Sequence, residues 1–140
     1  MSERQKIEYS QLETGHEFTP SSYKLDSSVV AAYLKAVEDT SSLYQDTGVV
    51  PPMAIAAYAM AALSDAICLP PGTIHVSQEF DFLDTASIDD TFTSCATVSK
   101  NQSRGKFHLL VVGLNVINQH QKAVLSGKTS FILPASSEDM

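Results

Sequence analysis

A run of apolar residues over 53–69, set between two proline pairs, constrains the fold of this chain most strongly. Pro51-Pro52 suits a helix start, because the first N–H groups of a helix have no partner within it. Pro70-Pro71-Gly72 ends the run. The run is apolar on almost every side and rich in alanine, so it predicts a central helix wrapped on several sides by protein.

A membrane-spanning helix is the alternative reading of the same run. It is disfavoured because the run is shorter than the ~20 residues needed and carries Ser64 and Asp65. We therefore expect the helix to lie in the core of a soluble domain, where its alanines let a sheet approach its axis closely.

The second half of the chain predicts strands. Residues 74–82 alternate apolar and polar side chains, which is typical of a half-buried strand and places His75 on the face opposite Phe80 and Phe82. Long strands joined by short turns indicate an antiparallel meander. Strands are expected at 74–82, 91–99, 107–117 and 123–133, with turns at 89–90, 101–105 and 118–122.

The first half predicts a shorter helix. Asp26 and the two serines after it offer oxygen atoms that can cap a helix, and apolar residues at helical spacing follow as far as Val37. A turn is expected at 39–42, and one or two short strands at 7–18. A helix buried against such a sheet is an α+β arrangement. We expect a single domain over residues 1–140, frayed from about residue 135.

Charge and cysteine usage exclude several classes of site. The 140 residues carry a formal net charge of −7, whereas nucleic acids and anionic membranes require clustered Lys and Arg. Cys68 and Cys95 have neither a second cysteine nor a histidine at metal-ligand spacing, so we expect two buried thiols and no metal site. Residues 1–9 are polar and contain no secretory signal, so a cytoplasmic protein is expected.

Five segments occur in an order that a known family shares. Residues 15–18 (GHEF) look like an early Gly-x-x-Phe, 33–44 like a first helix and its turn, and 50–53 (VPPM) like a Pro-Pro helix start. Residues 74–80 (IHVSQEF) look like a His-x-x-Gln-x-Phe strand, and 105–107 (GKF) like the glycine before a long strand. From Gly15 to Pro134 the chain thus resembles the MaoC-like dehydratases and hydratases, in their fatty-acid-synthase-type branch.

The resemblance implies a hot-dog fold, in which a curled antiparallel sheet wraps a long helix, and chemistry on acyl thioesters. Members of the family add water to, or remove it from, the 2,3 bond of an acyl-CoA or acyl-carrier-protein chain, using an Asp and a His to activate one water. Asp39 falls on the Asp of that motif, but Tyr44 stands where the His is expected. Tyrosine can donate a hydrogen bond but is a poor base at neutral pH, so the dyad is incomplete.

Other residues are candidates for the remaining roles. His75 either replaces the lost base or belongs to the structural strand motif. The family implies backbone N–H donors for the thioester at the helix start, and because prolines have none, Met53 and Ala54 are the candidates. A basic turn either binds the phosphates of CoA or phosphopantetheine or is a solvated hairpin tip. Its charged side chains are Lys100, Arg104 and Lys106.

The incomplete dyad favours one function and leaves three others open. We expect the acyl-binding, non-catalytic member of a hot-dog pair, in a homodimer or in a heterodimer with a second hot-dog domain. The alternatives are an active hydratase using Asp39 with His75 or Tyr44, an acyl-CoA thioesterase using Asp65, and a non-enzymatic ligand-binding module. The expected ligand is an acyl-CoA or acyl-carrier-protein thioester, and neither a cofactor nor a metal is expected.

Overall fold

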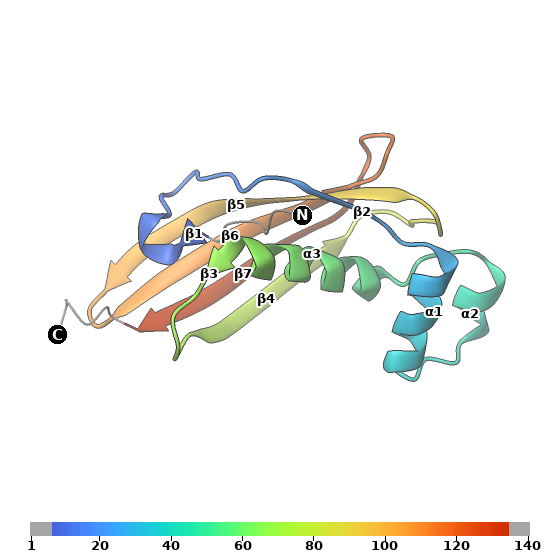
Figure 1. Cartoon of the computed structure of the whole chain (residues 1–140), viewed down its shortest axis with the longest axis horizontal. Helices are drawn as coiled ribbons and strands as arrows, with labels where there is room; N and C mark the ends of the chain where they lie inside the picture. The colour runs from blue at the N-terminus through green and yellow to red at the C-terminus, as the bar shows by residue number, and fades with distance from the viewer. Residues whose placement is uncertain (1–6, 135–140) are drawn as a thin grey trace, which may run out of the picture.

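The computed structural model describes residues 7–134, which form one five-stranded antiparallel sheet with a long helix along one face (Figure 1). In their order across the sheet, the strands are β2 (Ser21–Lys24), β5 (Thr91–Arg104), β6 (Phe107–Ile117), β7 (Ala123–Pro134) and β4 (Ile74–Phe82). The helices are α1 (Ser27–Ala36), α2 (Ser42–Asp46) and α3 (Pro52–Ala66), and α3 is the helix on the sheet. The predicted α+β class is confirmed. The tail from residue 135 lies outside the described residues.

Short elements pack beside the end of α3. β1 (Ile7–Glu8) pairs in parallel with β3 (Ile67–Cys68), and a 3₁₀ helix, η1 (Tyr9–Gln11), follows β1. A strand within 7–18 is thus confirmed, although it is only two residues long. The predicted helix over 67–69 is wrong, because the backbone of Ile67 and Cys68 pairs with β1 as a strand instead of extending α3.

The first predicted helix is confirmed as α1. Oδ1 of Asp26 accepts hydrogen bonds from the Ser28 hydroxyl at 2.7 Å and from the Val29 N–H at 2.9 Å. These two bonds hold the pKa of Asp26 below its ordinary value. The turn expected at 39–42 leads into α2, which the sequence pattern does not predict and whose first turn is capped by the Ser41 hydroxyl.

The central helix α3 starts at Pro52, as the proline pair predicts. Protein covers more than one of its sides, since the consecutive residues 54–56 are all buried and the Tyr23 ring of β2 stacks on Tyr58 at 5.4 Å. The covering is incomplete in the single chain, because Met53 and Tyr58 are still 50% and 38% exposed. The buried residues of α3 are Ala54, Ile55, Ala56, Ala59 and Leu63.

The predicted strands are present in the sheet, but their order differs from that of the predicted meander. β5, β6 and β7 form a meander, whereas β4 joins the far side of β7 and becomes an edge strand. The sequence pattern does not predict β2, because its residues SSYK show no apolar alternation. β5 runs beyond its predicted end at Ser99 as far as Arg104, so the turn expected at 101–105 is confined to Gly105 and Lys106.

The core continues along α3 in two clusters of buried side chains. The first cluster surrounds the start of α3 and contains Leu25 and Phe92, while the second surrounds its end and contains Leu110 and Leu133. Phe80 of β4 packs against both clusters. No helix in the described part of the chain is long and apolar enough to cross a membrane.

Candidate functional site

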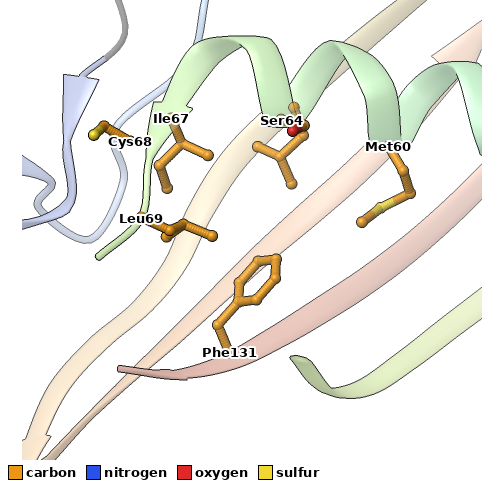
Figure 2. A pocket seen from close by; sticks show the side chains of 7 residues that line it. Met60, Ser64, Ile67, Cys68, Leu69 and Phe131 are labelled. Carbon is orange, nitrogen blue, oxygen red and sulfur yellow. The ribbon is translucent and has the colours of Figure 1, made fainter. Parts of the chain in front are cut away.

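A cavity of about 410 Å³ opens between the end of α3 and β7. Figure 2 shows Met60 of α3 and Phe131 of β7 pointing toward the same space. Among the described residues that line the cavity, Cys68 alone carries an ionisable group. The lining suits the apolar part of a ligand. The lining residues are Met60, Leu63, Ser64, Ile67, Cys68, Leu69 and Phe131.

A second cavity, of about 340 Å³, lies at the opposite end of α3. Pro52 and Ile55 of α3 line it together with Phe82 at the end of β4. At its edge, the carboxylate of Asp84 lies 2.5 Å from Nζ of Lys122. This hydrogen bond lowers the pKa of Asp84 and raises the pKa of Lys122, so both groups are charged at neutral pH.

Asp39 and Tyr44, the positions of the expected dyad, belong to the region of α1 and α2, beyond the start of α3 (Figure 1). Oδ1 of Asp39 accepts a hydrogen bond from the Ser41 N–H at 2.9 Å, so the carboxylate is engaged in its own turn. Tyr44 is half-buried and packs against the first core cluster. Neither residue lines either of the two cavities described above.

His75 lies on a different face of β4 from the one predicted. His75 is opposite Phe131 in β7, and a β-bulge at Val76 then adds one residue before the pairing resumes. The extra residue reverses the alternation, so His75 shares the face of Gln78 and Phe80. Sequence alternation alone placed it on the opposite face, and this prediction is wrong.

His75 also lies far along the molecule from Asp39. The start of β4 is beside the cavity that Phe131 lines, whereas its end at Phe82 lies at the start of α3. Because a strand rises about 3.3 Å per residue, roughly 20 Å separates His75 from Phe82. The structure therefore does not bring His75 together with Asp39.

One of the two backbone donors expected at the start of α3 is already used. The N–H of Ala54 donates to the carbonyl oxygen of Pro51 at 2.9 Å, and Ala54 is buried. Met53 is half-exposed and remains the candidate donor at this helix start. Asp65, the residue of the thioesterase alternative, is exposed on α3 and does not line the cavity that its neighbour Ser64 lines.

The basic residues lie on the β5–β6 hairpin and are exposed. Lys100 and Arg104 belong to β5 and Lys106 to the turn, and the Arg104 guanidinium donates to Oε1 of Gln102 at 3.2 Å. Phe107 pairs with the last residue of β7, which places the hairpin tip at the same end of the sheet as the larger cavity. Positive charge and apolar cavity thus share one end of the molecule, opposite to Asp39.

The two cysteines lie at an intermediate depth. Cys68 and Cys95 are half-buried, not fully buried as predicted, and neither forms a disulfide. Within residues 7–134, no three His, Cys, Asp or Glu side chains gather closely enough to hold a metal ion.

The sequence does not predict the larger cavity, although four of its lining residues show a recognisable spacing in the sequence. Met60, Leu63, Ser64 and Ile67 recur at helical spacing, so they could have been identified as one face of a helix. Phe131 completes the cavity from β7, and no local spacing connects it with that face.

Both the sequence and the fold of the chain are similar to those of known proteins. A family model described as FAS1-like, dehydratase domain region, matches residues 13–126. No curated protein sequence matches the chain. Among solved structures, the (R)-hydratase PhaJ1 of Pseudomonas aeruginosa is similar with a TM-score of 0.79 at 20% identity, covering 96% of this chain and 90% of that one.

Two further structures are similar over most of their length. The (R)-hydratase of A. caviae, involved in PHA biosynthesis, has a TM-score of 0.74 at 19% identity, with 89% of this chain and 98% of that chain covered. The truncated HadBC (3R-hydroxyacyl-ACP dehydratase) complex of Mycobacterium tuberculosis has a TM-score of 0.65 at 16% identity, with 85% and 96% covered. These likenesses show the hot-dog fold. Because the family model covers most of the residues, the chain belongs to the FAS1-like dehydratase domain family, and it shares its fold with solved (R)-hydratase and MaoC-like dehydratase structures.

Proposed function

We propose that the protein is the acyl-binding, non-catalytic member of a hot-dog pair, with an acyl-CoA or acyl-carrier-protein thioester as its ligand. The apolar cavity at the end of α3 carries this proposal. Its lining from Met60 to Phe131 suits a hydrocarbon chain, and each buried methylene contributes about 0.8 kcal/mol to binding. The basic hairpin at the same end supports a ligand that also bears phosphates.

The separation of the candidate catalytic groups supports the non-catalytic part of the proposal. General base catalysis needs a base within hydrogen-bond reach of the water that it activates. Asp39 is bonded within its own turn, Tyr44 packs into the core, and His75 lies at the other end of β4. Within residues 7–134, the candidates Asp39 and His75 therefore do not converge on one water.

The edge strand β4 supports pairing with a second hot-dog domain. A nine-residue edge strand presents backbone N–H and C=O groups that can extend a sheet into another chain. Exposed apolar side chains lie along this edge and on the uncovered side of α3, and HadBC is itself a complex. The exposed side chains are Met53, Tyr58, Ile74, Val76, Phe82 and Leu83.

Decanoyl-CoA should bind the purified chain saturably in calorimetry, whereas crotonyl-CoA should keep its enoyl-thioester absorbance when mixed with the chain. The cavity supplies the binding, and the missing dyad prevents the hydration. Asp39→Asn retains an oxygen that can accept the Ser41 N–H, so it should change neither result. Turnover of crotonyl-CoA that disappears in Asp39→Asn, or a failure of decanoyl-CoA to bind, would contradict the proposal.

Light scattering of the purified chain should give about twice the molar mass of one chain, because a second copy can cover β4 and the uncovered side of α3. Phe82→Lys should weaken this association at least roughly tenfold, since a charge placed in an apolar interface loses its hydration. Phe107→Lys is the matched control, at an aromatic residue that is 56% exposed against 46% for Phe82 but lies on the basic hairpin. A monomeric wild-type chain, or equal weakening by both substitutions, would argue against pairing through β4.

A further inference from the structure

The bulge at Val76 places His75 and Gln78 on one face of β4, where both are near Thr129. Nε2 of His75 lies 2.7 Å from Oγ1 of Thr129 and 3.1 Å from Oε1 of Gln78. Thr129 is fully buried, so the imidazole is attached to the fixed interior of the sheet. Bulges commonly re-aim side chains beside functional sites.

The orientation of the Gln78 amide decides which nitrogen of His75 carries the proton. Nε2 of Gln78 donates to the carbonyl oxygen of Lys128 at 3.2 Å and faces that of Glu79 at 3.4 Å. The reversed amide would set Oε1 against two carbonyl oxygens, which are also acceptors. Oε1 therefore faces His75, and because an amide oxygen only accepts, Nε2 of His75 must carry the proton.

A neutral imidazole protonated on Nε2 presents Nδ1 as a hydrogen-bond acceptor. Nδ1 takes no part in the hydrogen bonds of Nε2, and His75 is exposed. The ring packs against Phe131 with centroids 5.0 Å apart, and Phe131 lines the larger cavity. The acceptor thus belongs to a ring that packs against a residue of the cavity lining.

We infer that His75 is a ligand-binding residue whose Nδ1 accepts a hydrogen bond from a hydroxyl or amide N–H of the ligand that fills the cavity. The inference rests on the proposed acyl-binding function and adds a hydrogen-bond acceptor beside a cavity whose polar side chains are Ser64 and Cys68. Two parts of an acyl thioester carry such donors: the hydroxyl of a 3-hydroxyacyl chain and the amides of the pantetheine arm. A free carboxylate offers only acceptors, so Nδ1 favours thioesters and hydroxyacyl groups over ionised fatty acids.

Three ligands separate the two donors. Methyl decanoate has neither, methyl 3-hydroxydecanoate has only the hydroxyl, and S-decanoyl-N-acetylcysteamine has only the amide N–H. His75→Phe keeps a ring against Phe131 and removes the acceptor. We expect this variant to weaken binding of one or both donor-bearing ligands by roughly threefold to tenfold and to leave methyl decanoate unchanged. Equal weakening for all three ligands, or no weakening for either donor-bearing ligand, would overturn the inference.

Nitrogen-15 NMR of the wild-type chain provides a readout without ligand. The His75 proton should be found on Nε2, and Gln78→Leu should move it toward Nδ1, because Thr129 can then donate to Nε2. A wild-type ring protonated on Nδ1 would overturn the inference even if His75→Phe does not fold. If methyl decanoate fails to bind the wild-type chain, the acyl-binding function fails and the inference with it. If it binds and the donors make no difference, only the role of His75 fails.

Discussion

Gly127→Ala is expected to lower the free energy of unfolding by about 2 to 3 kcal/mol, because β4 and β7 leave no room for a methyl group at this position. A Cβ at Gly127 would lie 2.6 Å from the carbonyl oxygen of Glu79 and 2.9 Å from Cδ1 of Phe80. The first contact is with the backbone of the facing strand, so β4 must shift. The Phe80 ring packs against both core clusters and cannot move aside without disturbing them. Urea denaturation measures the loss.

Gly113→Ala is the matched control, in the strand next to β7. A Cβ at Gly113 would meet the Thr97 carbonyl oxygen at 3.8 Å, an ordinary contact. We expect this variant to be more stable by about 0.4 to 1 kcal/mol, since alanine reduces the freedom of the unfolded chain. Hydrogen exchange over 74–82 should be faster in Gly127→Ala alone. Equal stability of the two variants would mean that β4 is not held as tightly against β7 as described.

The start of α3 and the long strands show which parts of the fold local sequence predicts. Pro51-Pro52 sets the first turn of α3, and the strands expected at 74–82 and 107–117 have the predicted bounds. These signals lie in residues that are neighbours in the sequence. The end of α3, in contrast, is set by a segment far away in the sequence, because Ile67 and Cys68 continue the apolar pattern of the helix but pair with β1.

The candidate site was harder to predict because contacts between distant segments build it. The prediction that Tyr44 stands in place of a histidine needs only the sequence, since the motif positions lie close together. The face of His75 is not, because the bulge at Val76 is defined by pairing with β7 and leaves no mark on the alternation. Phe131 closes the cavity from the last strand, so the cavity exists only once the sheet has formed.

Ser64→Trp is expected to raise the Kd for decanoyl-CoA roughly fiftyfold. Ser64 lines the larger cavity on α3, one turn after Met60, and an indole ring there would occupy the space of part of the acyl chain. Displacing about three methylenes at about 0.8 kcal/mol each costs roughly 2.4 kcal/mol of binding free energy, which is about fiftyfold in Kd. Calorimetric titration of the variant against the wild-type chain measures the change.

Asp65→Trp places the same side chain one residue further along α3, at an exposed position outside the cavity lining, and should leave the affinity unchanged. The length of the acyl chain gives a second criterion, because a tryptophan ring in the cavity interferes only with acyl chains that are long enough to reach it. The loss caused by Ser64→Trp should therefore shrink from decanoyl-CoA to hexanoyl-CoA and vanish for butyryl-CoA. An equal loss for all chain lengths would mean that the acyl group does not enter this cavity. A loss confined to long chains would assign the cavity to the end of the acyl group furthest from the thioester, and the thioester itself to its rim.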